Sequence, residues 1–407
     1  MIQVQKAKSI IKDHIFPLEM ENVPLGQAEN RVLSQDVRAT FPMPRFDNSA
    51  MDGFAARSVD IQGASQSHSV TLKVVGISSA GSPSELALGS GECIQCMTGA
   101  EIPAGADTVV MVEHTSGFSG SDSVQIFLET PPGKHIRKKG EEIREGDILI
   151  SKGTRITPSE IGTLATFGYG EFSVVKKPRI AIFGTGDELV EPGSKLRSGD
   201  IYNSNLYVFA ELVEKIGGEV TMRNVIKDDK DALRSFLSRA LNTCDVIISS
   251  GGVSMGRFDY VRDVFMELGV QEYFWKVAQK PGKPLFFGSG NDTLIFGLPG
   301  NPVSSYIGFM EWVWSVLETM MGIPESKPTT GILTEPFPRE KVKYRYLFGQ
   351  AWLENGKLVC KPTIKIGSHM LSSSLEANCI LGSEQGEIPL KAGDEIYVNI
   401  LPWKNIQ

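Results

Sequence analysis

From Arg179 to Pro302, short apolar segments alternate with segments of helical periodicity, and this alternation restricts the possible folds more than any other feature. The apolar segments are nearly continuous, which is typical of parallel strands that are buried on both faces. We expect strands at 179–183, 219–226, 245–249, 284–288 and 293–297, and helices at about 203–216, 230–241, 258–268 and 302–321. The pattern predicts an α/β/α domain with a mostly parallel sheet.

The regions on either side of this domain differ from it in pattern. Apolar residues recur at helical spacing over 3–16, which predicts an amphipathic helix. From about 45 to 145, short strands alternate with glycine, proline and serine, which predicts a β-rich insert. A small β-barrel-like domain is expected at the C-terminal end, with a turn at Asn355-Gly356. The expected multidomain organisation is 1–175, 176–326 and 327–407.

Composition excludes several classes of protein. The 407 residues are 41% hydrophobic and carry a net charge of −7, which argues against a general nucleic-acid binder. No run of apolar residues is long enough to span a membrane, and the N-terminus lacks a signal-peptide pattern. Five cysteines, an odd number, fit a reducing compartment. We therefore expect a cytoplasmic protein without a membrane or nucleic-acid partner.

Cys93 and Cys96 form a lone C-x-x-C motif. Such a motif can bind zinc or perform redox chemistry, but here it has no second cysteine pair and no nearby histidine. We interpret the two cysteines as small residues of a strand.

The strand at 245–249 is followed by a loop of glycine and hydroxyl residues. Gly251 and Gly252 allow the backbone to approach a ligand closely, and exposed N–H groups together with Ser254 can bind phosphate oxygens. In parallel sheets, ligands bind beyond the carboxyl ends of the strands, where this loop is expected. The segment therefore predicts a site for an anionic, nucleotide-like ligand.

Two further segments favour the same kind of ligand. The first is K-P-G-K-P at 280–284, where prolines stiffen a loop that carries lysines. The second is G-L-P-G-N-P at 297–302, which leads into a helix whose N-terminus carries partial positive charge. Lys276 lies shortly before the first segment, and the anion-binding candidates are Lys276, Lys280, Lys283, Pro299 and Asn301.

Acidic residues near these loops predict a metal site. Glu188 follows the first strand in G-T-G-D-E-L, and Asp259 lies on a neighbouring loop. Mg²⁺ is typically held by one or two carboxylates together with phosphates of the ligand, so these two side chains could share one ion. A dinucleotide fingerprint would require a third glycine where Leu189 stands, and the P-loop pattern is absent.

Six motifs in register identify a family. They are N-S-A-M-D-G-F-A (48–55), M-T-G-A-E-I-P-A-G-A-D (97–107), G-T-G-D-E-L (184–189), S-S-G-G-V-S-M-G (249–256), K-P-G-K-P and G-L-P-G-N-P. With these motifs the chain resembles the molybdopterin molybdenumtransferase family and the matching domain of gephyrin-type proteins. The resemblance spans essentially the whole chain.

The resemblance implies a reaction and an assembly. The protein is expected to be a transferase that inserts molybdate into adenylylated molybdopterin with Mg²⁺, releasing molybdenum cofactor and AMP. A homodimer is implied, in which each cleft combines the α/β domain of one subunit with the β-rich N-terminal region of the other. A transient contact with the adenylyltransferase is also expected.

The family motifs assign roles to residues of this chain. The implied catalytic acids are Asp52, Glu188, Asp228 and Asp259, with Glu188 and Asp259 nearest the metal. The resemblance also assigns Thr98, Glu142 and Ser368 to substrate binding. Two positions depart from the family pattern: Glu142 stands where an aspartate is usual, and Phe348 stands where an arginine is expected.

Two alternative functions remain at this stage. A molybdopterin adenylyltransferase shares the α/β domain but normally lacks regions like 1–170 and 330–407. A non-enzymatic scaffold of the gephyrin kind would bind peptides through its last domain, but this chain has no additional adenylyltransferase domain or long linker. The choice between molybdate and tungstate is left open, because both are dianions of similar shape.

Overall fold

The computed structural model describes residues 1–227, 229–252, 260–325, 327–364 and 367–406, and these form two compact units. The first unit comprises 1–35, 152–161 and 171–407, and the second comprises 36–151 and 162–170. The second unit is inserted into the chain of the first, and it is rich in strands, as predicted for the N-terminal insert.

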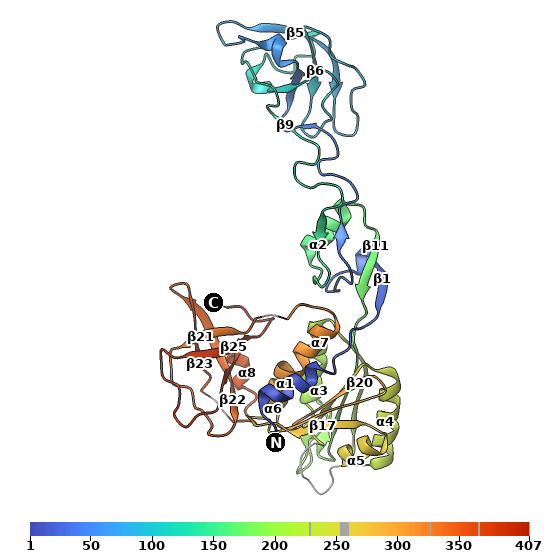
Figure 1. The fold of residues 1–407 in the computed structure, drawn as a ribbon, viewed down its shortest axis with the longest axis vertical. Helices are drawn as coiled ribbons and strands as arrows, with labels where there is room; N and C mark the ends of the chain where they lie inside the picture. The colour runs from blue at the N-terminus through green and yellow to red at the C-terminus, as the bar shows by residue number, and fades with distance from the viewer. Residues whose placement is uncertain (228, 253–259, 326, 365–366, 407) are drawn as a thin grey trace. The chain divides into compact units, whose positions relative to one another are not determined.

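The central sheet of the first unit has a mostly parallel topology, which confirms the predicted fold class (Figure 1). Its strand order is β15 (Glu219–Ile226), β12 (Arg179–Thr185), β16 (Val246–Ser250), β20 (Thr293–Leu298), β19 (Pro284–Gly290) and β17 (Gln271–Lys276). The first four strands are parallel to one another, whereas β19 pairs antiparallel with both β20 and β17. The antiparallel edge and the strand β17 were not predicted.

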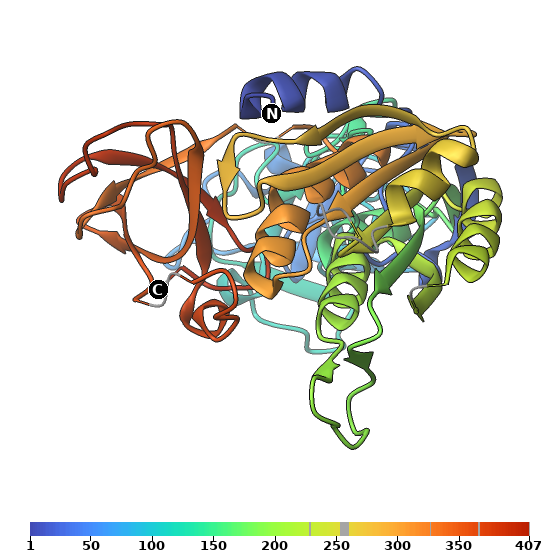
Figure 2. The ribbon, with the colours of Figure 1, turned by 90° about the horizontal axis from the view of Figure 1, so that it is seen from below.

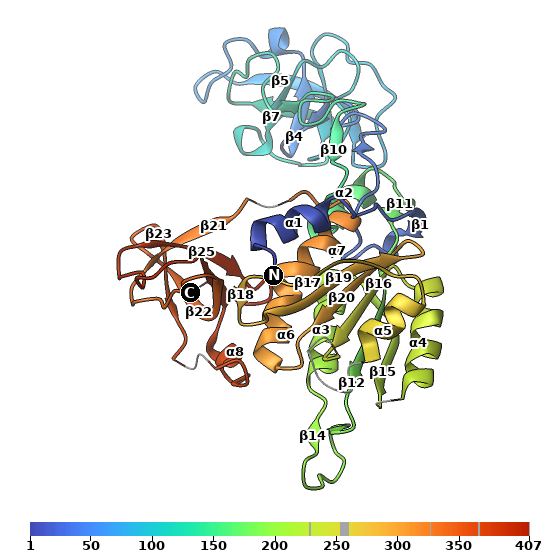
Figure 3. The same cartoon turned by 60° about the horizontal axis from the view of Figure 1, so that its bottom comes forward.

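The two faces of the sheet are covered by different helices (Figure 3). Along β12, Ile180 and Ile182 pack with α3 (Asn205–Ile216), whereas Ala181 and Phe183 pack with α4 (Lys230–Thr243) and α5 (Tyr260–Glu267). Successive side chains of a strand point to opposite faces, so a strand covered on both sides must be apolar throughout. This explains the uninterrupted apolar segments of the sequence.

The helix predicted over 302–321 is present but is interrupted. It consists of α6 (Pro302–Gly308), a π-helical turn η4 (Phe309–Val313) and α7 (Trp314–Met320). The predicted N-terminal helix is α1 (Val4–Lys12), whose buried face packs against the same core as α7. No helix within the described ranges is long and apolar enough to cross a membrane.

The C-terminal part of the first unit forms a closed barrel, as predicted (Figure 2). Its strands follow the order β22 (Tyr344–Glu354), β23 (Lys357–Pro362), β21 (Thr329–Leu333), β25 (Glu395–Ile400) and β24 (Cys379–Ser383), and β24 pairs again with β22. Asn355 and Gly356 form the predicted two-residue turn between β22 and β23, and both have positive φ angles. The short strand β18 (Gln279–Lys280) joins the barrel to the α/β domain by pairing with β22.

The second unit is built on a sheet with the order β7 (Thr108–Met111), β4 (Gly53–Ala56), β6 (Glu92–Cys96), β5 (Val70–Ser78) and β8 (Ser123–Ile126). Its core includes Phe54, Leu72 and Val110. The remaining elements, which belong to both units, are short: β1 (Met20–Pro24), η1 (Leu25–Gln27), β2 (Val37–Arg38), β3 (Asn48–Ser49), η2 (Ser58–Ile61), η3 (Val112–His114), β9 (Ile136–Arg137), β10 (Ile148–Ile150), α2 (Pro158–Thr166), β11 (Glu171–Val175), β13 (Leu189–Val190), β14 (Ile201–Tyr202) and α8 (Ser373–Glu376).

Candidate functional site

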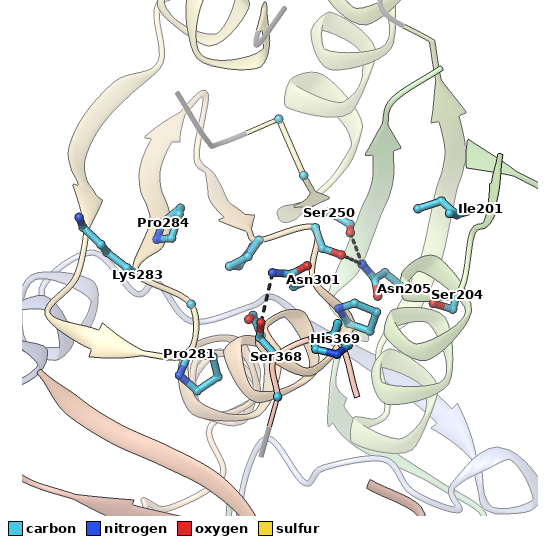
Figure 4. Close-up of a pocket in the computed structure, with 18 of the residues that line it drawn as sticks. Ile201, Ser204, Asn205, Ser250, Pro281, Lys283, Pro284, Asn301, Ser368 and His369 are labelled. Carbon is cyan, nitrogen blue, oxygen red and sulfur yellow. Dashed lines mark hydrogen bonds between the residues drawn. The ribbon is translucent and has the colours of Figure 1, made fainter. Parts of the chain in front are cut away.

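A large cavity lies at the carboxyl edge of the parallel strands in the first unit (Figure 4). Its volume is about 1170 Å³, and its wall includes Thr185 at the end of β12, Ser250 at the end of β16 and Pro299 just after β20. The predicted glycines Gly251 and Gly252 also line it, and both have positive φ angles. At Gly252, an added Cβ would lie 2.3 Å from a Val261 side-chain atom, so only glycine fits there.

Asn205, the first residue of α3, connects the end of β16 with the segment that follows β20. Its amide nitrogen donates to Ser250 Oγ at 2.7 Å (Figure 4). It also donates to the Gly300 carbonyl oxygen at 2.8 Å and to Ser305 Oγ at 3.3 Å. These hydrogen bonds hold the ends of β16 and β20 against the start of α3. This side chain therefore links three elements at the edge of the sheet.

The K-P-G-K-P loop forms a second part of the wall, and Lys280 and Lys283 both line the cavity. The loop precedes β19, which is antiparallel to β20, so it reaches the same edge of the sheet as the carboxyl ends of the parallel strands. The buried Gln279 holds the loop: its amide donates to the Gly282 carbonyl oxygen at 2.8 Å and accepts from Trp312 Nε1 at 3.0 Å.

Lys276 pairs with Pro284 at the start of β19, but it is not among the described residues that line the cavity. It ends β17, and its ammonium nitrogen lies 4.5 Å from the ring centroid of Trp275. Of the three predicted lysines, Lys280 and Lys283 therefore line the cavity and Lys276 does not.

Residues of the barrel region form a further part of the wall. Lys343, Arg345, Ser368 and His369 line the cavity, and Ser368 Oγ accepts a hydrogen bond from Asn301 at 3.3 Å (Figure 4). Phe348 is buried and packs edge-to-face on Tyr306, with ring centroids 5.2 Å apart. The cavity-lining arginine of this strand is thus Arg345, and Phe348 belongs to the core.

Glu188 is exposed and lines the cavity. Its carboxylate lies over Gly186, where an added Cβ would come within 2.5 Å of a Glu188 oxygen. Among the described residues that line the cavity, it is the one carboxylate, and the described ranges contain no cluster of three potential metal ligands. One carboxylate with ligand phosphates fits the usual Mg²⁺ arrangement, so the donors present are compatible with this ion.

Three predicted site residues, Asp228, Ser254 and Asp259, lie outside the described residues. The predicted pairing of Glu188 with Asp259 around a metal therefore stays a prediction.

The remaining predicted residues belong to the second unit. Asp52 Oδ1 accepts two hydrogen bonds from Thr98, one from the backbone N–H and one from the hydroxyl, both at 2.7 Å. These two hydrogen bonds lower the pKa of Asp52 below its ordinary value, and the bond from the backbone N–H has the larger effect. Glu142 is exposed, and its backbone N–H donates to the Met43 carbonyl oxygen. Asp52 and Thr98 thus form one local pair.

Cys93 and Cys96 are buried in β6, as expected for strand residues. Burial raises the pKa of Cys93 to about 12 and that of Cys96 to about 11. Both side chains are therefore protonated thiols at neutral pH, which is not the state that binds zinc or attacks a disulfide.

The cavity is suited to a large anion. Among the described residues that line it, four carry positive charge and one carries negative charge: Lys280, Lys283, Lys343, Arg345 and Glu188. Side-chain hydroxyls and glycine-rich backbone add hydrogen-bond donors for phosphate oxygens. Sequence reasoning missed Asn205, Gln279, Lys343, Arg345 and His369, because no motif marks them and their positions depend on how separate segments pack.

Comparison with known proteins agrees with this architecture. Residues 2–168 match the MoeA N-terminal region (domain I and II), 181–319 a probable molybdopterin binding domain, and 330–401 the MoeA C-terminal region (domain IV). The molybdopterin molybdenumtransferase of Haemophilus influenzae is 33% identical over 404 residues, covering 98% of both chains. That of Bacillus subtilis is 35% identical, covering 95% of this chain and 91% of the relative. A crystal structure of the molybdopterin biosynthesis MoeA protein from Pyrococcus horikoshii has a TM-score of 0.85 at 29% identity, covering 98% and 99%.

Proposed function

The chain belongs to the molybdopterin molybdenumtransferase family, and from this premise we propose that its cavity binds adenylylated molybdopterin together with molybdate. The protein is a transferase that inserts molybdenum in the biosynthesis of molybdenum cofactor. The observation that carries the proposal is the cavity at the carboxyl edge, which combines basic side chains with glycine-rich backbone and one exposed carboxylate. Both proposed ligands are multiply charged oxyanions.

The residues of the wall have distinct roles in this proposal. Lys280, Lys283 and the backbone around Gly251 hold the phosphoanhydride and offset its charge as AMP leaves. Ser368 and Asn301 position the pterin side of the substrate. Glu188, with Asp259, would hold Mg²⁺, which supplies additional positive charge to the breaking phosphoanhydride.

The assembly is also part of the proposal. We infer a homodimer in which Asp52 and Thr98 of one subunit complete the cavity of the other, and this would give the local pair of Asp52 and Thr98 a role. A transient contact with the adenylyltransferase fits the same scheme, because the adenylylated substrate must be made by a preceding reaction. A cytoplasmic location is supported by the five buried cysteines, all of which are free thiols.

The direct test is to incubate the protein with adenylylated molybdopterin, molybdate and Mg²⁺. We expect AMP release in step with cofactor formation. Formation of the adenylylated species from ATP would instead support an adenylyltransferase, and absence of any turnover would support a scaffold.

A substitution of the cavity carboxylate tests its role. Glu188→Gln keeps the shape of the side chain but removes its charge, so we expect AMP release to fall by about a hundredfold and to lose its response to Mg²⁺. Glu214→Gln, at an exposed position of α3, is the matched control and should behave like the wild type. Unchanged Mg²⁺ dependence in Glu188→Gln would refute the assignment.

A further inference from the structure

Two cations of the cavity wall are neighbours in a strand pair. β18 and β22 run parallel, with Lys280 opposite Arg345 in the register. Both side chains also line the cavity. Adjacent strands are only about 4.8 Å apart, so two positive charges in this position repel each other unless an anion lies between them.

Glu340 supplies that anion. Its Oε1 atom lies 2.6 Å from Lys280 Nζ and 3.8 Å from Arg345 Nη1. The hydrogen bond from Lys280, and then the charges of Lys280 and Arg345, lower the pKa of Glu340 below its ordinary value. The carboxylate is therefore ionised at neutral pH and neutralises part of the charge of this cation pair.

Arg345 is only partly satisfied by this arrangement. Its side chain is 7% exposed, and its distance of 3.8 Å from Glu340 is too long for a hydrogen bond. Its Nε atom is buried and has no hydrogen-bond partner among the described residues. A guanidinium group offers five N–H donors in a planar fork, and a buried donor without an acceptor is unfavourable. An anion with several oxygens would satisfy this group better than one carboxylate oxygen does.

The Glu340 side chain can move away from Lys280 and Arg345 without disturbing the backbone around it. It is 29% exposed, and the adjoining backbone is held independently: the Gly386 N–H donates to the Glu340 carbonyl oxygen at 2.8 Å, and Arg339 Nε donates to the Glu384 carbonyl oxygen at 3.0 Å. Rotation of one side chain would be enough to release both cations toward the cavity.

We propose that Glu340 is a built-in competitor for the anion site, and that a tetrahedral oxyanion dianion displaces it from Lys280 and Arg345 when substrate binds. This inference rests on the proposed function, since the oxyanion is either molybdate or the phosphoryl group of the adenylylated substrate. Replacing a carboxylate of charge −1 by a dianion improves the neutralisation of the surrounding cations, whereas a monoanion gains little from the exchange. Glu340 thereby lowers the affinity of the site for every anion, and a dianion offsets this cost through its stronger attraction to the two cations.

Binding of molybdate alone, followed by calorimetry, tests the proposal without any turnover. Glu340→Gln keeps the shape of the side chain and removes the competing charge, so molybdate should bind about tenfold more tightly. The monoanion perchlorate should gain by a similar factor, because both anions have to displace the same carboxylate. Glu354→Gln, at the exposed end of β22, is the matched control and should leave both affinities unchanged.

A double variant verifies that Arg345 mediates the effect. Arg345→Gln should weaken molybdate binding about tenfold, and the gain from Glu340→Gln should shrink when both changes are combined. The melting temperature of each variant confirms that it is folded. The same measurement with AMP in place of molybdate shows which oxyanion displaces Glu340. If Glu340→Gln binds AMP more tightly but binds molybdate as the wild type does, the phosphoryl group is that oxyanion.

Unchanged or weaker affinity of folded Glu340→Gln for both molybdate and AMP would overturn the inference. That result would leave the transferase assignment intact if the wild type still released AMP. Conversely, Glu340→Gln could bind molybdate or AMP more tightly while the wild type shows no transferase activity. That result would support Glu340 as a competitor and refute the proposed function.

Discussion

At the scale of the residue, hydrogen bonds to a carboxyl group determine how strongly its ionised form is favoured. The two bonds from Thr98 to Asp52 lower the pKa of that carboxyl group, so the ionised form of Asp52 is favoured in the folded state. A carboxyl group with a lowered pKa contributes stability above its ordinary pKa, and this contribution is lost as the pH falls through the folded-state pKa.

Thr98→Val should raise the pKa of Asp52, because it removes the hydroxyl donor and retains the backbone N–H. A carboxyl NMR titration measures this directly, and Thr98→Ser, which keeps the hydroxyl, should titrate like the wild type. If Asp52 titrates identically in Thr98→Val, the hydroxyl contributes nothing to its charge.

At the scale of secondary-structure elements, the sequence predicted the strands, the helices of regular pattern and the mostly parallel sheet, but not the antiparallel edge of that sheet. The strands β12, β15, β16, β19 and β20 were all expected, because their apolar segments are bounded by clear turns. Periodicity does not encode whether a neighbour runs parallel or antiparallel, so the reversed edge formed by β19 and β17 was missed. The π-helical turn at Phe309–Val313 was missed as well, since its residues are buried on every side and no polar face marks the extra residue.

Gln279 connects the π-helical turn to the loop at the cavity, and this connection gives a prediction. Gln279→Leu would leave the Trp312 N–H and the Gly282 carbonyl oxygen without partners, at a cost of about 1–3 kcal/mol for each group. We expect a lower free energy of unfolding and a KM for the adenylylated substrate raised by about tenfold, because the loop between Lys280 and Lys283 loses its anchor. Denaturant unfolding and steady-state kinetics measure the two effects.

The exposed Gln271 of β17 provides the control for this change. Gln271→Leu should alter neither stability nor KM appreciably. A Gln279→Leu protein with reduced stability but normal KM would show that the amide supports the fold without positioning the loop.

Glu311, in the same π-helical turn, gives the fold a dependence on pH. Burial raises the pKa of this carboxyl group, although Lys8 at 3.8 Å and a hydrogen bond from Asn399 at 2.8 Å oppose the shift. A raised pKa means that the folded state retains its proton longer than the unfolded state, so stability falls as the pH rises above about 4.3, the ordinary value for glutamate.

Replacing Glu311 by glutamine removes this titration. As the pH rises above about 4.3, Glu311→Gln should therefore gain stability relative to the wild type, until the pH exceeds the folded-state pKa of Glu311. Unfolding free energies measured at a series of pH values provide the comparison. A difference between the two proteins that stays constant with pH would contradict the assignment.

At the scale of the whole molecule, some of the residues proposed from sequence lie together at the cavity. Gly251, Gly252, Glu188 and two of the three lysines line it, and each of them lies in a short motif next to a regular strand. Lys343 and Arg345 were not found, because they reach the cavity only through the pairing of β18 with β22, which are more than sixty residues apart. Long-range pairing of this kind has no local signature in a single sequence.

The cavity lies in the first unit, and we propose that the second unit of another subunit completes it. This claim can be tested by co-expressing two inactive variants, Asp52→Asn and Glu188→Gln. In a mixed dimer with sites shared between subunits, one site carries both changes and the other carries neither. Random pairing should then restore about one quarter of wild-type AMP release.

Size-exclusion chromatography and separate affinity tags on the two variants allow the mixed dimer to be isolated and assayed alone. The account predicts that this dimer has about half the wild-type activity per dimer, since one of its two sites is intact. Activity no greater than that of either variant alone would contradict the account and would place Asp52 and Glu188 in the same subunit's site.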